Sequence, residues 1–198
     1  MSSVATTEPT RGADPGTGWG AAAPAGVRPT FVVGIGNPIL GDDGIGWRVV
    51  QEVERRWASE PEVGLSVGPA SPPVVFLCVS LGGLSLMERL VGASSAILVD
   101  AVTTRNRPVG SILVLPLAEL VPGVSGHLDN AHDASLPVAL AVGRSLGAEL
   151  PTRIVVVGIE ARRVDEFGEE LSPPVAAALP GAVEAVLDLL RQAVAGSR

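Results

Sequence analysis

The stretch that decides the fold is Phe31-Val-Val-Gly-Ile-Gly36, a compact apolar run ending in glycines, which is typical of a buried strand. A loop follows, and after it we expect a helix from about Asp43, because apolar residues recur there at steps of three and four. These residues are Ile45, Val49, Val50, Val53 and Trp57. A buried strand followed by an amphipathic helix is the repeating unit of an α/β protein.

The same alternation continues along the chain. Further strands are expected at residues 74–79, 96–100, 112–115 and 154–157, with a weaker candidate at 65–67. Helices are expected at residues 84–90, 135–146 and 173–194. Ser172 is the expected N-cap of the last helix, and a bend is expected at Pro180-Gly181. Because the strands are continuous β-branched runs, both faces of the sheet should be covered, which predicts an α/β, mostly parallel, doubly wound sheet.

Composition excludes several classes of protein. The chain has 198 residues, so one domain is expected. Its net charge is −7, so it lacks the excess of basic residues that binding to nucleic acid or to an anionic membrane requires. One Cys excludes a disulfide framework and cysteine-rich zinc or iron–sulfur sites. That residue, Cys78, lies in an apolar strand, where a buried, inert thiol is expected. Two His residues limit a metal centre to one or two imidazoles, with carboxylates supplying the other ligands.

The chain divides into two parts. Residues 1–28 are rich in Ala, Gly, Thr and Pro and are expected to be a flexible extension, whereas residues 29–198 form the α/β domain. The extension lacks the basic start and apolar run of a signal peptide. No stretch approaches the ~18–20 uninterrupted apolar residues needed to span a bilayer. We therefore expect a cytoplasmic protein.

Three polar clusters follow the expected strands, at the edge of the sheet where ligands bind in such folds. They are residues 34–46, which contain Asp42 and Asp43; Asp100, which ends an apolar strand; and residues 126–133, which contain His127 and His132.

Each of these polar side chains also has a purely structural interpretation. Asp42 could cap a helix, and Asp43 could interact favourably with the positive N-terminus of that helix. Asp100 could bond the amides of the next turn, and His132 could lie on the surface before a helix. Taken together, two carboxylates and an imidazole at one edge suit a divalent metal ion with open positions for water or substrate.

Four segments carry a resemblance to a known family. They are Gly34-Ile-Gly-Asn37 through Asp42-Asp-Gly-Ile-Gly46; Ile97-Leu-Val-Asp-Ala-Val102; Asn130-Ala-His132; and Gly158-Ile-Glu160 followed by Leu171-Ser-Pro-Pro-Val175. In order and spacing the chain resembles the nickel–iron hydrogenase maturation proteases, which are metal-dependent endopeptidases. Members of this family remove a C-terminal extension from the hydrogenase large-subunit precursor.

The resemblance implies a twisted five-stranded sheet between helices, in three layers. It also implies that Asp43, Asp100 and His132 contact the metal, with Asp42 as a possible auxiliary residue. The metal would be nickel already placed in the precursor, so that cleavage follows correct loading, and zinc or cadmium would suit the same ligands. Whether that metal polarises the scissile carbonyl or activates a water stays open. The implied partner is the large-subunit precursor, and the free protein is expected to be a monomer.

One segment departs from the family pattern. Where many members have an Asp-Gly-Gly-Thr-like sequence, this chain has Leu81-Gly-Gly-Leu84, which retains Gly82 and Gly83 as possible auxiliary residues but lacks the acid and the hydroxyl. This difference indicates a different partner large subunit, and it also leaves open an accessory protein that binds the subunit without cutting it. A third interpretation, a peptidyl-tRNA hydrolase, rests on Gly34-Ile-Gly-Asn-Pro38 but lacks the His-Asn pair and the basic surface expected there.

Overall fold

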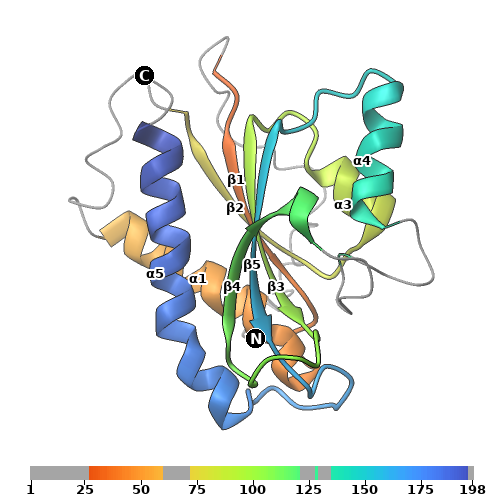
Figure 1. Ribbon diagram of the computed structural model, residues 1–198. Helices are drawn as coiled ribbons and strands as arrows, with labels where there is room; N and C mark the ends of the chain where they lie inside the picture. Colours follow the sequence, from red (N-terminus) through yellow and green to blue (C-terminus); the bar gives the residue numbers. More distant parts are fainter. Residues whose placement is uncertain (1–26, 60–71, 121–127, 129–134, 196–198) are drawn as a thin grey trace, which may run out of the picture.

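The computed structural model describes residues 27–59, 72–120, 128 and 135–195 (Figure 1). The domain predicted from residue 29 onward is represented in these ranges, and most of the extension predicted for residues 1–28 lies outside them. The weak strand candidate at residues 65–67 lies outside them as well.

The strands form one sheet in the order β2-β1-β3-β5-β4. Their bounds are β1 Thr30–Ile35, β2 Val74–Val79, β3 Ser95–Val102, β4 Ile112–Pro116 and β5 Arg153–Glu160. All run parallel except β4, which is antiparallel to β5 at one edge. This confirms the predicted five-stranded, mostly parallel sheet. In the sheet, β2 lies on one side of β1 and β3 lies on the other, so the chain moves outward from β1 in opposite directions. A topological switch point therefore lies between β1 and β3.

Helices cover both faces of the sheet and complete three layers (Figure 1). One face carries α1 (Ile45–Ser59) and α5 (Pro173–Ala195), and the other carries α3 (Gly83–Arg89) and α4 (Leu136–Ser145). Two short 3-10 turns, η1 (Gly41–Gly44) and η2 (Leu117–Glu119), follow β1 and β4.

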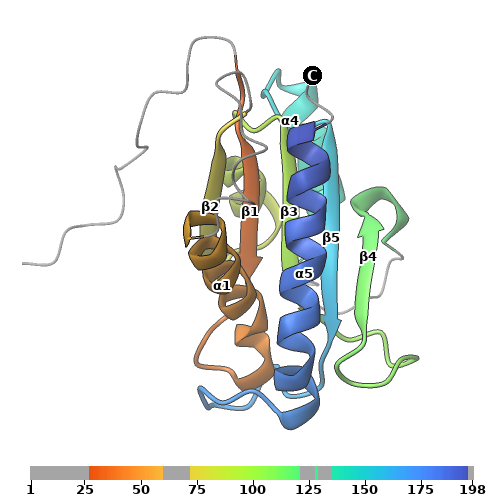
Figure 2. The same ribbon diagram turned by 90° about the vertical axis from the view of Figure 1, so that its left-hand side faces the viewer.

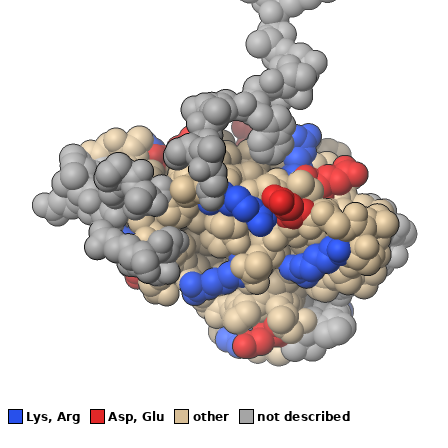
Figure 3. Space-filling model, turned by 90° about the horizontal axis from the view of Figure 1, so that it is seen from above, with Lys and Arg blue, Asp and Glu red and all other residues tan. Residues whose placement is uncertain are grey.

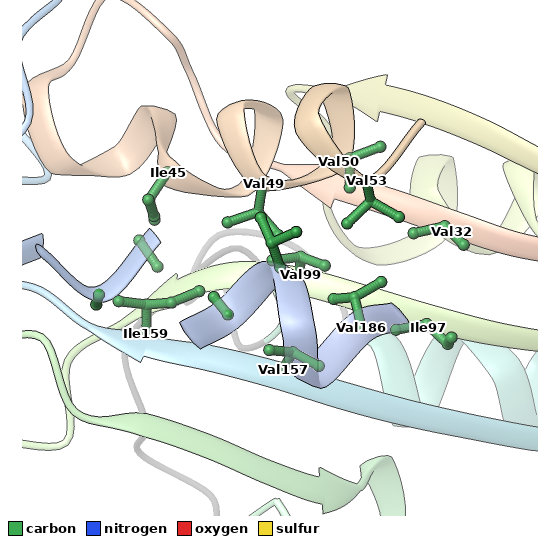
Figure 4. Close-up of a cluster of buried hydrophobic side chains, with 14 of the residues drawn as sticks. Val32, Ile45, Val49, Val50, Val53, Ile97, Val99, Val157, Ile159 and Val186 are labelled. Atoms are coloured by element: carbon green, nitrogen blue, oxygen red, sulfur yellow. The ribbon is translucent and has the colours of Figure 1, made fainter. Parts of the chain in front are cut away.

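Two apolar clusters, one on each face, hold the layers together. Figure 4 shows the first, in which Val49 and Val53 of α1 meet Val99 of β3 and Val186 of α5. The second lies under α3 and α4 and includes Leu98, the residue that precedes Val99 in β3. Successive residues of a strand point to opposite faces, so an uninterrupted apolar run supplies both clusters.

The last helix runs through Pro180 without a break. Ser172 directly precedes it, as predicted for the N-cap residue: its carbonyl accepts a hydrogen bond from the Ala176 N–H, and its hydroxyl donates to Asp42. Residues 173–194 are long and apolar enough to cross a membrane by length and composition alone. In this fold α5 packs on the sheet through Val183, Leu187 and other buried residues, as a core helix does.

Candidate functional site

The candidate site lies at the carboxyl ends of β1, β3 and β5, beside the switch point. The loop after β1 and the turn η1 sit at this edge, and η1 contacts β3. The opposite end of the molecule, where the parallel strands begin, is seen in Figure 3 and carries basic and acidic side chains next to one another, among larger uncharged areas.

Two glycines allow η1 and the start of α1 to come this close to the sheet. A Cβ on Gly46 would lie 2.3 Å from the carbonyl oxygen of Ile35 and 2.5 Å from that of Val99, so only hydrogen fits between the helix and the two strand ends. Gly36 has φ +130°, and a Cβ there would lie 1.9 Å from the carbonyl oxygen of Asp43. The glycines of the first motif therefore set the position of the acidic pair against β3.

Asp43 is buried and held by the loop that precedes it. Its Oδ2 accepts a hydrogen bond of 2.6 Å from the main-chain N–H of Asn37, and its own N–H donates to Leu40. The side chain is 4% exposed, so the carboxylate is oriented within the fold and not on a solvated surface. Asp43 precedes α1, which begins at Ile45, so the predicted helix starts two residues later than expected.

Asp42 has a different role from its neighbour. Its two carboxylate oxygens accept hydrogen bonds from the N–H of Ser172 (2.6 Å) and from the Ser172 hydroxyl (2.9 Å), while its own N–H donates to Arg163. Asp42 therefore does not cap α1. It joins the turn after β1 to the start of α5, and both carboxylate oxygens are engaged there.

β3 continues to Val102, so Asp100 lies within the strand and does not end it as predicted. Its side chain has no solvent exposure. By the alternation of the strand it shares a face with Leu98, which is the face covered by α3 and α4. Its register partner on β5 is Gly158, so the adjacent strand places no side chain directly beside the carboxylate. Asp43 and Asp100 are thus both buried, on elements that contact each other at the switch point.

His132 and its neighbour His127 lie outside the described residues, so the third predicted ligand stays a prediction. Leu128 and Leu136, on either side of residues 129–134, are both buried in the cluster beneath α3 and α4. That is the face of the sheet to which Asp100 belongs. Within the ranges that the structure describes, no three His, Cys, Asp or Glu side chains gather as a metal site.

Glu160 is a buried carboxylate at this edge that the sequence reasoning left without a role. It ends β5 and accepts hydrogen bonds from the Thr104 N–H (3.0 Å), the Thr104 hydroxyl (2.7 Å) and the Arg105 N–H (3.0 Å). Arg105 has φ +61°, and the bond to Glu160 fixes its N–H in this left-handed conformation. The signal that identified Asp100, an acidic residue closing an apolar strand, was equally present at Glu160.

The predicted auxiliary glycines also lie at this edge. Gly82 precedes α3, and Gly83, which is buried with φ +50°, is its first residue. The segment of residues 81–84, which departs from the family pattern, therefore lies at the carboxyl end of β2, at the same end of the sheet as the acidic residues.

Cys78 lies in β2 and is not part of the site. Burial, with a smaller contribution from Glu54, raises the pKa of its thiol to about 11. A thiol with this pKa is almost entirely protonated near neutral pH, in agreement with the inert role predicted for it.

The geometry first defines a class: an α/β protein with two buried carboxylates at the switch point of its sheet, where oxygen ligands can meet a divalent cation. Comparison with known proteins then gives the family. The sequence model of the hydrogenase maturation protease family matches residues 71–189, which is more than half of the chain, and this protein belongs to that family. The matched residues contain Asp100 but not the acidic pair.

Individual relatives cover more of the chain. The hydrogenase 2 maturation protease of Escherichia coli K12 is 27% identical over 163 residues, 82% of this chain and 90% of that protein. The hydrogenase expression/formation protein HupD of Thiocapsa roseopersicina is 26% identical over 162 residues, 82% of this chain and 67% of that protein. An aligned stretch of this length in a chain of 198 residues necessarily includes both Asp43 and Asp100.

Solved structures agree with the fold. The hydrogenase maturating endopeptidase HybD of Escherichia coli superposes with a TM-score of 0.63 at 26% identity, covering 83% of this chain and 93% of that one. The nickel–iron hydrogenase maturation protease HybD of Thermococcus kodakarensis superposes with a TM-score of 0.57 at 21% identity, covering 81% and 98%, and supports the fold alone.

Proposed function

We propose that this protein is an endopeptidase that removes the C-terminal extension of a nickel–iron hydrogenase large-subunit precursor after nickel has been inserted. Membership of the maturation protease family and the names of the relatives above support this activity. The proposal carries with it a metal-dependent reaction, a cytoplasmic location and a free protein that is monomeric.

The observation that carries the proposal is the pair of buried carboxylates at the switch point. Asp43 and Asp100 are 4% and 0% exposed, and burial of an acidic side chain is costly unless it is paired, hydrogen-bonded or bound to a cation. Two carboxylates supply the oxygen ligands of a mixed nitrogen and oxygen site, and His132 would supply the nitrogen.

In this proposal nickel is part of the substrate. Asp43, oriented by the Asn37 N–H, and Asp100, held in β3, would contact the nickel that the precursor presents. A precursor without nickel would lack this contact, so cleavage would depend on loading. The reaction consumes one water and breaks one peptide bond, leaving a new carboxylate on the large subunit and a new amine on the released extension.

The test is mass spectrometry of the C-terminus of the hydrogenase precursor after incubation with this protein, using precursor loaded with nickel and precursor without it. We expect Asp43→Asn, Asp100→Asn and His132→Ala each to abolish cleavage while circular dichroism and the unfolding midpoint show a folded protein. Asp165→Asn is the matched control, because it makes the same change at an exposed site.

The possible outcomes separate the alternatives. If Asp100→Asn or His132→Ala trims the nickel-loaded precursor at the wild-type rate, the assignment of the metal contacts is wrong. A wild-type protein that binds the precursor and leaves its C-terminus intact would instead be an accessory protein. Equal cleavage with and without nickel would show that the reaction does not depend on the metal. Loading the precursor with zinc or cadmium in place of nickel tests which ions the ligands accept.

A further inference from the structure

On the β4 side of the sheet, no further strand from the described residues pairs with the outer edge of β4. β4 is antiparallel to β5 and is the last strand in the sheet order, and Figure 2 shows it as the outermost strand on that side. Val114, at the middle of β4, is 49% exposed. An edge strand presents a row of main-chain groups that can pair with another extended chain.

The hydrogen-bond pattern identifies which groups face outward. The Glu160 N–H donates to the Ser111 carbonyl, so every second residue from Ser111 onward bonds β5, and the N–H and C=O groups of Ile112 and Val114 point away from the sheet. No hydrogen bond from the described part of the chain is made to these outward groups. Pro116, the next outward residue, has no N–H, which limits the edge to two donors.

The edge is continuous with the candidate site. Asp100 is in register with Gly158 on β5, and Gly158 is in register with Leu113 on β4, so the three residues form one row across the sheet. With strands about 4.8 Å apart, a chain added beside β4 would lie about 14 Å from the backbone of Asp100. At about 3.3 Å per residue, four or five extended residues span that distance.

A pocket of about 560 Å³ lies at the other end of β4, on the α4 face. Leu117, Leu140 and Ile154 form its buried apolar floor, and the exposed residues Arg144 and Arg153 also line it. The Arg144 guanidinium donates a hydrogen bond of 3.0 Å to the Pro151 carbonyl. Among the residues that the structure describes, no carboxylate pairs with Arg153. The pocket therefore suits an apolar side chain next to a carboxylate.

We infer that the outer edge of β4 binds an extended segment of the large-subunit precursor as an additional strand, with an apolar side chain and a neighbouring acidic group of that segment in the pocket beside α4. This inference rests on the proposed function and names the surface that would guide the precursor to the acidic residues. The strand hydrogen bonds supply binding that is independent of sequence, whereas the pocket and its two arginines supply the preference for an acidic, apolar segment.

The first experiment measures amide hydrogen exchange of the wild-type protein by NMR, with and without the full-length precursor and with a precursor lacking its C-terminal extension. We expect protection of the Ile112 and Val114 amides by the full-length precursor. Unchanged exchange at these amides in a complex that forms and is cleaved overturns the inference and leaves the proposed function standing. Protection that grows with the concentration of this protein alone indicates pairing with a second copy and overturns it too.

The second experiment compares variants by the Kd for the full-length precursor. Val114→Pro removes an outward N–H that β5 does not use, and it places a ring where the added strand would lie. Loss of one hydrogen bond alone changes Kd by about 2- to 13-fold. Because the ring also obstructs the added strand, we expect Kd to rise about tenfold or more. Val114→Ala keeps the N–H and should stay within about twofold of wild type. The kcat at saturating precursor should be retained in both variants, because Val114 lies on the edge strand, away from the acidic residues.

A charge reversal tests the pocket without altering the strand. Arg153→Glu should raise Kd about tenfold, whereas Arg89→Glu, at an exposed position on α3, should not. Wild-type Kd values for both Val114→Pro and Arg153→Glu, in folded protein, would overturn the inference. A wild-type protein that binds no precursor would overturn the proposed function together with it.

Discussion

The contact between Asp42 and Ser172 offers a direct test of the difference between the two adjacent acidic residues. Replacing Asp42 by Ala removes the acceptor for both the N–H and the hydroxyl of Ser172, and both groups are buried. Asp42→Asn keeps one carbonyl oxygen at nearly the same position, and Ser172→Ala removes the hydroxyl alone. The three variants therefore remove different parts of one contact.

The expected magnitudes follow from the two bonds. A hydrogen bond to a charged group contributes about 1.5–3 kcal/mol, so Asp42→Ala, which removes two of them, should lower the free energy of unfolding by about 3–6 kcal/mol, out of a total of about 5–15 kcal/mol. Asp42→Asn and Ser172→Ala should each lower it by about 1–2 kcal/mol. The two residues are in contact, so the double variant should show a coupling energy of about 1–2 kcal/mol.

The assay is urea unfolding followed by circular dichroism, with cleavage of the nickel-loaded precursor measured under conditions in which each variant is fully folded. Asp42→Asn should lose stability and keep most of its activity, whereas Asp43→Asn should show the reverse. If Asp42→Asn unfolds at the wild-type urea concentration and is inactive, Asp42 acts in the reaction and the structural role is wrong.

The remaining predictions concern the surroundings of the site. Gly46→Ala should lower the free energy of unfolding by at least about 1–3 kcal/mol and reduce cleavage, because the added methyl group pushes the start of α1 away from the Val99 carbonyl. Unchanged urea unfolding would contradict the close approach of α1 to β3. Glu160→Gln should lower the free energy of unfolding by about 1–3 kcal/mol and speed amide exchange at Thr104. Slow exchange at Thr104 in this variant would show that other contacts hold the loop. At pH 8 iodoacetamide should alkylate Cys78 about 100-fold more slowly in the folded protein than in urea, and equal rates would rule out a raised pKa. Because the folded pKa of this thiol lies above its ordinary value, its contribution to stability should fall as the pH rises from about 9 to about 11, which urea unfolding across that range would measure.

The sequence was sufficient for the architecture because its apolar patterns are unambiguous. The runs at β1, β3 and β5 are too continuous for half-exposed strands, and these three strands are buried, whereas β2, at the sheet edge, is partly exposed throughout. The spacing from Ile45 to Trp57 is helical. The antiparallel direction of β4 was not predictable, because an apolar run of five residues carries no information about which way it runs in the sheet.

The location of the site at the carboxyl ends of the strands was predictable from the sequence, but the roles of its individual residues were less so. Asp42 and Asp43 are chemically identical neighbours, and what separates them is a contact with Ser172, 130 residues further along the chain. No local pattern reports such a contact. Glu160 shows the opposite case, since its position at the end of an apolar strand was visible, but its partners, Thr104 and Arg105, were not.

The bond between Asp42 and Ser172 has a consequence for how the protein is made. The turn that carries Asp43 leaves the ribosome early, but its anchor at the start of α5 is synthesised only after β5 is complete. A nascent chain can therefore hold β1, α1 and β3 without a finished acidic site. The proposed activity is therefore acquired only when nearly the whole chain has emerged, and a fragment ending before α5, which also lacks the core residues of that helix, should be inactive.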